Sequence, residues 1–235
     1  MENYFNQITN LLVQPTGSMV YHLVISFVFI SVLQPALSFI GGDKEGRKRL
    51  LTGILLLIAS RLVLFIFSLL ALVGVEGLTN SLGIIEIAVN ALDISIIIWL
   101  FAFTGENRTG DMGLAVFGLL ILAAGIISVI FWNLQDSADA FNQSALAFRW
   151  ELATLLIIVI GLFTLYTSKT PAKIQGMILL GILLFGEALQ TIIPPVEGDF
   201  FPVSRLVHLI AFPLLTGILQ NYVLASGKQA YGDTT

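Results

Sequence analysis

Long apolar runs alternate with short polar segments along most of the sequence. A helix that crosses a membrane needs about 20 predominantly apolar residues, because each residue rises 1.5 Å and the hydrocarbon core is about 30 Å thick. Runs of this length occupy residues 18–40, 50–74, 81–104, 113–133, 145–167, 174–193 and 202–225. The pattern predicts an all-α polytopic membrane protein, whose residues 18–225 form a bundle of seven transmembrane helices.

Two shorter segments flank the predicted bundle. In residues 1–17, apolar side chains recur on one helical face, a pattern typical of an amphipathic helix lying in the membrane interface; they are Tyr4, Phe5, Ile8, Leu11 and Leu12. The sequence Pro15-Thr16-Gly17 is expected to break that helix before the first span. Residues 226–235 are expected to form a short cytoplasmic tail.

The charged loop residues are distributed unevenly between the two sides of this layout. Basic residues follow the first, third, fifth and seventh spans: Lys44, Arg47, Lys48, Arg49, Arg108, Lys169, Lys173 and Lys228. The opposite loops contain no Lys or Arg and carry Glu76, Asp136, Asp139, Glu197 and Asp199. Because cytoplasmic loops are enriched in Lys and Arg, we expect the N-terminus outside and the C-terminus in the cytoplasm.

The amino-acid composition excludes several classes of functional site. The chain is 57% hydrophobic and 11% charged with a mean hydropathy of +0.94, and it contains no cysteine, which excludes disulfides and thiolate metal sites. The net charge of −4 argues against a nucleic-acid partner. No GxSxG, HExxH or P-loop motif occurs, no span contains a lysine for a retinal Schiff base, and the two histidines lack metal-ligand spacing. We therefore expect no catalytic activity, no metal and no cofactor.

Ionisable residues inside the spans are the strongest functional signal, because each costs several kcal/mol unless it is paired, faces the bundle interior or reaches water. Arg61 and Asp93 lie at similar predicted depths in neighbouring antiparallel spans, which predicts an ion pair near the membrane midplane. Such a pair is either a structural clamp between two helices or a participant in ligand binding or signal transfer.

The remaining charges cluster toward the outer side. Polar stripes at helical spacing occur on the third, sixth and seventh spans, and an Arg205–Glu187 pairing would neutralise two of the charges. Arg149 and Glu151 point about 200° apart, so at most one of them faces inward. We expect an outer polar cavity, with Trp132, Trp150 and Phe201 near its rim, that binds a small zwitterion, amine or carboxylate. Its predicted ligand-binding residues are Glu86, Asn90, Arg149, Glu187, Gln190, Arg205 and His208.

A plainer interpretation applies to two of these residues. Arg149 and Arg205 lie close enough to the outer boundary for their side chains to reach lipid head groups instead of a cavity. Pro213, in the middle of the last span, removes a backbone hydrogen bond and favours a kink, which is either a hinge or an ordinary feature of a membrane helix.

The last span, RLVHLIAFPLL at residues 205–215, together with seven spans and short loops, resembles the multi-span N-terminal sensor regions of bacterial histidine kinases. The resemblance implies a location in the inner (plasma) membrane of a bacterium and sensing of a ligand or of the membrane state, with the last helix leading to a cytoplasmic signalling module. We therefore expect a receptor or sensor that binds a small polar or lipid-like ligand in its outer half, is surrounded by membrane lipids, and signals to a cytoplasmic protein. The alternatives are a non-catalytic accessory subunit of a larger membrane complex and, less favoured by the scarcity of polar residues in the inner halves, a small transporter.

Overall fold

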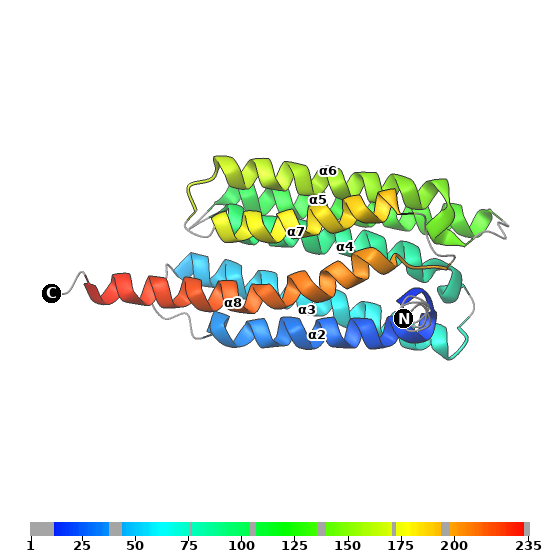
Figure 1. Ribbon diagram of the computed structural model, residues 1–235, viewed down its shortest axis with the longest axis horizontal. Coiled ribbons are helices and arrows are strands. Elements are labelled where there is room, and N and C mark those ends of the chain that lie inside the picture. Colours follow the sequence, from blue (N-terminus) through cyan, green and yellow to red (C-terminus); the bar gives the residue numbers. More distant parts are fainter. Residues whose placement is uncertain are drawn as a thin grey trace.

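A computed structural model of the chain describes residues 12–37, 44–75, 77–103, 107–135, 140–170, 173–193 and 198–232. These residues contain seven long helices and no strand (Figure 1). The helices are α2 (Pro15–Leu37), α3 (Lys44–Leu72), α4 (Leu78–Ala102), α5 (Arg108–Leu134), α6 (Ala145–Thr167), α7 (Lys173–Ile192) and α8 (Pro202–Gly232), with a 3-10 turn η1 (Phe141–Gln143) before α6. All seven long helices contain a segment of sufficient length and apolarity to cross a membrane, which indicates a multi-pass membrane protein.

The helices run side by side along the long axis of the molecule (Figure 1). Helix α2 packs against α3 and α8, α3 packs against α4, α4 packs against α6 and α7, and α7 packs against both α6 and α8. Helix α4 is the central element, since 78% of its most apolar window is buried, whereas the corresponding value for α5 is 22%. The polar side chains of α4 therefore face the protein interior.

Glycines bring α5 against α4. The buried face of α5 includes Gly118 and Gly125, and a Cβ atom at Gly125 would lie 3.0 Å from the Cβ of Ala88 on α4. Small residues permit close approach of two helix backbones, which gives van der Waals contact where no hydrophobic force is available between helices in lipid. The remainder of α5 exposes large apolar side chains, as expected for a surface that faces hydrocarbon.

The start of the first span differs from the expectation. The chain bends at Gln14 and α2 already begins at Pro15, because proline is well suited to the first turn of a helix. Leu12, which we expected on a membrane-surface face, is instead 7% exposed. The other expected interfacial residues lie outside the described part of the chain. At the other end, α8 continues past residue 225 to Gly232, into the segment expected to be a tail.

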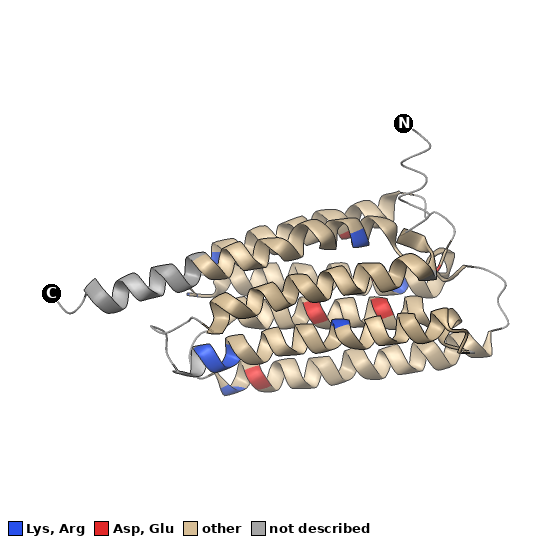
Figure 2. Cartoon of the chain, turned by 90° about the horizontal axis from the view of Figure 1, so that it is seen from below, with Lys and Arg blue, Asp and Glu red and all other residues tan. Residues whose placement is uncertain are grey.

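Basic residues gather at one end of the bundle, where Figure 2 shows blue segments beside the end from which α8 projects. Among the described side chains this end, here called the basic end, carries Arg47, Lys48, Arg49, Arg108, Lys169 and Lys173. Figure 2 also shows red and blue segments within the otherwise tan middle of the helices, where ionisable residues are enclosed by the bundle.

Candidate functional site

A buried arginine organises the half of the bundle away from the basic end. Arg205, in the first turns of α8, is fully buried and forms a bidentate ion pair with Glu86 of α4, with Nε 2.8 Å from Oε1 and Nη2 in contact with Oε2. Nη2 also donates to Ser18 Oγ of α2 at 2.8 Å, and Nη1 donates to the carbonyl oxygen of Leu12. This guanidinium therefore links α8, α4, α2 and the segment before α2.

Aromatic rings complete the surroundings of this guanidinium. Its Cζ lies 3.8 Å from the ring centroid of Phe200 and 4.8 Å from that of Tyr21. Ring faces carry partial negative charge, so both contacts stabilise the cation in addition to its hydrogen bonds. Arg205 is thus held by the protein on all sides and does not reach lipid head groups.

The N-terminus of α8 is held by a side chain of α7. Gln190 Oε1 accepts hydrogen bonds from the backbone N–H groups of Val203 at 2.9 Å and Ser204 at 3.4 Å. The first N–H groups of a helix lack partners within the helix, and an acceptor at this position stabilises it. Gln190, expected to bind ligand, therefore caps α8 and fixes the position from which Arg205 projects.

Two histidines extend the network on either side of the ion pair. His22 Nε2 lies 3.1 Å from Glu86 Oε2, and the Tyr21 hydroxyl lies 3.0 Å from Nδ1 of His208 on α8. The other nitrogen of His208, Nε2, has no hydrogen-bond partner and lies 3.7 Å from Oε1 of Glu187 on α7. A chain of polar groups therefore runs from α4 through α2 and α8 to α7.

The carboxyl group of Glu187 accepts one hydrogen bond and has no Lys or Arg partner among the described residues. Its Oε2 accepts from the hydroxyl of Ser204 at 3.0 Å, and Glu151 on α6 is a second buried carboxyl group. Within the described residues, no Lys or Arg lies at ion-pair distance from either carboxyl group. The two glutamates are therefore the buried carboxyl groups that lack a Lys or Arg partner among the described residues of this half of the bundle.

A second ion pair lies deeper in the bundle. Arg61 Nη2 of α3 is 2.5 Å from Asp93 Oδ2 of α4, both side chains are fully buried, and the Ser60 hydroxyl donates to Asp93 Oδ1 at 2.7 Å. Nε and Nη1 of Arg61 have no hydrogen-bond partner, although its Cζ lies 5.4 Å from the ring of Phe212. The ring of Phe212 also stacks on His208, with ring centroids 4.8 Å apart. Phe212 therefore contacts both the Arg61–Asp93 pair and the network around Arg205.

Several expectations about these residues need correction. The predicted Arg205–Glu187 pairing is wrong, because Arg205 pairs with Glu86. Arg149 is exposed on the surface of α6, whereas Glu151, on the opposite side of the same turn, is buried. Arg149 therefore does not line an interior site, whereas Glu151 faces inward.

The other predicted residues lie in the interior. Asn90 is buried on α4 and its Oδ1 has no hydrogen-bond partner. The aromatic residues expected at a rim, Trp132, Trp150 and Phe201, are buried core residues, and the Trp150 indole N–H donates to Ser128 of α5 at 3.1 Å.

The contributions of α2 were missed. Ser18, Tyr21 and His22 lie at i, i+3 and i+4, which places them on one helical face, and this spacing was the signal that could have identified them. The Leu12 carbonyl could not have been found, because any residue type supplies a backbone oxygen. Within the described ranges, no three His, Cys, Asp or Glu side chains gather as ligands of one metal ion would.

Comparisons with known proteins do not assign this site to a family. The chain matches no protein-family model, no curated protein and no solved structure. Its function must therefore be inferred from the arrangement of its own residues.

Proposed function

We propose that this chain is a membrane receptor or sensor that binds a small, positively charged molecule, such as an amine, near Glu151, Glu187 and His208. The observation that supports the proposal is the charge balance of the buried network. Arg205 is neutralised by Glu86 and Arg61 by Asp93, whereas Glu151 and Glu187 have no Lys or Arg partner in the described residues. Buried carboxylates are unfavourable without a partner, so a cationic ligand would supply the missing charge.

The free nitrogen of His208 supports the same location. Nε2 of His208 is buried without a hydrogen-bond partner, so the free energy lost when water was removed from it is not offset by a new hydrogen bond. It points toward Glu187 at 3.7 Å, beyond ordinary hydrogen-bond distance. A ligand ammonium that moved these two side chains apart would donate to both groups, while the Tyr21 hydroxyl contacts the imidazole ring on its other side.

We further propose that the end of the bundle opposite the basic end faces the outside of an inner (plasma) membrane, with the C-terminus in the cytoplasm. Basic residues at the ends of α3, α5, α6 and α7 support this orientation. The ligand would then enter from the outer side.

Helix α8 is the proposed output element. It carries Arg205 and His208 near its start and Pro213 in its middle, and it bends between its first and second halves in Figure 1 before continuing to Gly232. A ligand that displaces His208 would therefore act on the same helix that leads away from the bundle. This arrangement fits the resemblance to the sensor regions of histidine kinases, in which the last helix leads to a cytoplasmic signalling partner.

The test is native mass spectrometry of the chain released from its own membrane, comparing wild type with Glu187→Gln. We expect a reproducible adduct with the mass of a small amine on the wild type and its loss in Glu187→Gln, without a decrease in the melting temperature of the ligand-free protein. Arg149→Gln is the control, since it also removes one charge, its side chain is exposed on α6, and the adduct should remain in place. Persistence of that same amine adduct in Glu187→Gln would overturn the proposed site, whereas a retained phospholipid would not bear on it.

A non-catalytic accessory subunit of a larger membrane complex is the second candidate. It is favoured by the contacts of Arg205, whose three nitrogens all donate to groups of the protein itself, as a purely structural clamp requires. Under this alternative the same spectra would contain stoichiometric protein partners and no adduct.

A further inference from the structure

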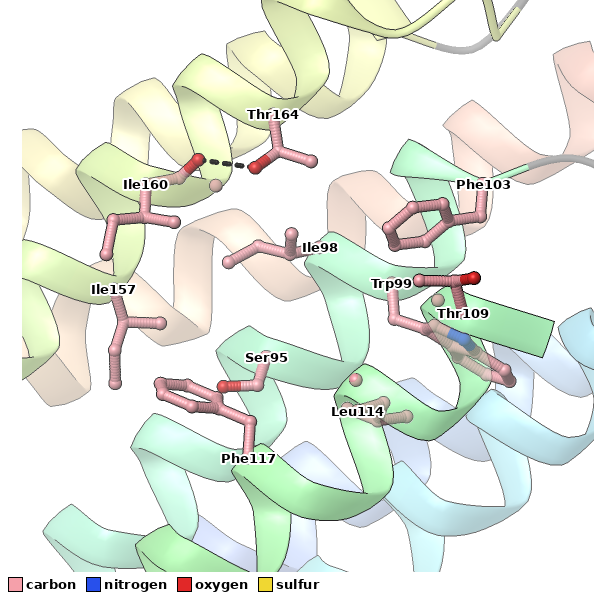
Figure 3. Close-up of a pocket in the computed structure, with 13 residues that line it drawn as sticks. Ser95, Ile98, Trp99, Phe103, Thr109, Leu114, Phe117, Ile157, Ile160 and Thr164 are labelled. Carbon is pink, nitrogen blue, oxygen red and sulfur yellow. Dashed lines mark hydrogen bonds between the residues drawn. The ribbon is translucent and has the colours of Figure 1, made fainter. Parts of the chain in front are cut away.

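A cavity of about 280 Å³ lies between α4, α5 and α6, away from the polar network (Figure 3). Engineered protein cavities of ~150 Å³ already accommodate benzene, so this cavity admits a longer hydrocarbon segment. It opens sideways between α5 and α6, where Phe117 is 40% and Ile160 is 54% exposed. Its opening therefore faces the lipid side of the bundle.

The interior of this cavity offers few hydrogen bonds. Ser95 Oγ donates to the carbonyl of Ala91 and Thr164 Oγ1 donates to the carbonyl of Ile160, so both hydroxyl protons are used within their own helices. Ile98, Phe103 and other apolar side chains supply the remaining walls in Figure 3. The part of an occupant that enters the cavity must therefore be apolar.

One wall is held rigidly. The Trp99 indole N–H donates to Asp111 Oδ1 at 3.0 Å, and the same oxygen accepts from Arg49 Nη2 at 3.0 Å. The Arg49 guanidinium also lies 5.4 Å from the Trp99 ring centroid. An indole fixed on both sides is a preformed surface, which lowers the entropic cost of binding an alkyl chain.

Two exposed basic residues are close in sequence to residues that line the end of the cavity nearest the basic end. Thr109 and Gly110, in the first turn of α5, line the cavity, and the neighbouring Arg108 is exposed. Lys169, also exposed, follows the end of α6 shortly after the cavity-lining Thr164. Basic residues beside a groove between membrane helices attract anionic lipid head groups.

We propose that this cavity binds one acyl chain of an anionic phospholipid, with the phosphate beside Arg108 and Lys169. A phospholipid fits both features at once, because its chain matches the apolar interior and its phosphate matches the basic residues at the adjacent end of α5 and after α6. The site lies at the opposite end of the bundle from the proposed ligand site and does not depend on it.

Quenching of Trp99 fluorescence by brominated lipids tests the proposal. The protein is reconstituted in phosphatidylcholine vesicles that contain a small fraction of either phosphatidylglycerol or phosphatidylcholine with brominated acyl chains. The Trp99 signal is the difference between wild type and Trp99→Phe. We expect brominated phosphatidylglycerol to quench at a mole fraction lower by about tenfold than brominated phosphatidylcholine, given the attraction expected from two basic residues.

Two variants locate the lipid. A Cβ atom at Gly113, which lines the cavity, would have no atom within 4 Å, so Gly113→Leu should fold normally and fill the cavity, abolishing the preferential quenching. Gly181→Leu on α7 is the matched control, because Gly181 has equally open surroundings outside the cavity. Arg108→Gln combined with Lys169→Gln should remove the preference for the anionic lipid. Native mass spectrometry from the same vesicles should give one retained phosphatidylglycerol per wild-type chain and none for Gly113→Leu.

Two results would overturn the proposal. Equal quenching by both lipids, unchanged in Gly113→Leu, would mean that Trp99 meets only the surrounding bilayer. A dimer in mild detergent that is lost in Gly113→Leu but not in Gly181→Leu would mean that a second copy of the chain covers the cavity.

Discussion

At the scale of single residues, two arginines illustrate how burial decides the role of a charge. Arg149 and Arg205 both lie near one end of a predicted span, and both could have reached head groups. Arg149 does lie on the surface, whereas Arg205 is fully buried, and its burial is offset by Glu86, Ser18 and the Leu12 carbonyl. Breaking a buried ion pair is costly because it leaves the remaining charge without a partner.

We predict that Arg205→Gln destabilises the bundle by about 3–5 kcal/mol, because Glu86 is then left buried without its bidentate partner. The free energy of unfolding can be measured by titration of mixed micelles with dodecyl sulfate, followed by circular dichroism. Arg149→Gln makes the same chemical change on an exposed side chain and should alter stability by less than about 0.5 kcal/mol. Equal effects of the two substitutions would contradict the assigned role of Arg205.

Asp199, between α7 and α8, provides a pH-dependent prediction. Burial raises the pKa of Asp199 above its usual value, and the nearby Arg205 offsets this only in part. The folded state then binds the proton more tightly than the unfolded state, so stability falls as the pH rises through the interval between the two pKa values. Asp199→Asn should therefore raise the melting temperature at pH 7, and this gain should shrink as the pH is lowered toward about 4. A gain that is constant over this range would exclude titration of Asp199 as its cause.

At the scale of helices and loops, the start of α4 fixes the end of the bundle opposite the basic end. Gly83 packs against the backbone carbonyl of Asp199 and the ring of Phe141, so α4 meets both the segment before α8 and the turn before α6. Asn142 strengthens this junction, since its Nδ2 donates to the Phe200 carbonyl at 3.0 Å. The same segment places the ring of Phe200 against the guanidinium of Arg205. The packing of this loop on α4 therefore helps to position Arg205.

Gly83→Ala should destabilise the protein by about 1–3 kcal/mol, because the added Cβ would clash with a backbone oxygen that cannot move independently. The matched substitution Gly113→Ala meets no atom within 4 Å and should be neutral or stabilising by up to about 1 kcal/mol, through the higher helix propensity of alanine. Thermal unfolding in one detergent compares the two directly. Tolerance of Gly83→Ala would show that the two segments are not packed on α4 as described.

At the scale of the whole molecule, the distribution of basic residues bears on the direction of the chain across the membrane. The basic end holds the described Lys and Arg side chains of the loops, while the polar network lies nearer the other end. The proposed outward-facing ligand site and the proposed cytoplasmic output of α8 both depend on the basic end being cytoplasmic.

Cysteine labelling measures this direction without background, because the chain contains no cysteine. Gln143→Cys lies on an exposed position of η1, and Lys169→Cys lies on an exposed position at the basic end. A membrane-impermeant maleimide should label Gln143→Cys in intact spheroplasts and Lys169→Cys only in inverted vesicles. The reverse pattern would reject the orientation and, with it, entry of the ligand from outside.

The sequence by itself determined the number and approximate position of the spans, since hydrophobic length is a local property that each segment carries alone. It also indicated that Arg61 and Asp93 share a depth, because a short connection makes their two helices antiparallel neighbours. The structure indeed places their charged groups 2.5 Å apart. The sequence analysis listed Arg149 rather than Glu151 as a ligand-binding residue, and the structure instead turns Glu151 inward. Helical geometry separates the two side chains but does not say which one meets the bundle.

Only the tertiary structure decided which charges are paired and which remain uncompensated. Arg205 could have met Glu187 on the preceding helix, yet it pairs with Glu86, 119 residues away, because α8 packs between α2 and α7 with its first turns facing α4. The partner of a buried charge depends on the rotation and neighbours of every helix around it, and no local pattern encodes these. The lateral cavity has the same origin, since it exists only where α4, α5 and α6 leave space between them.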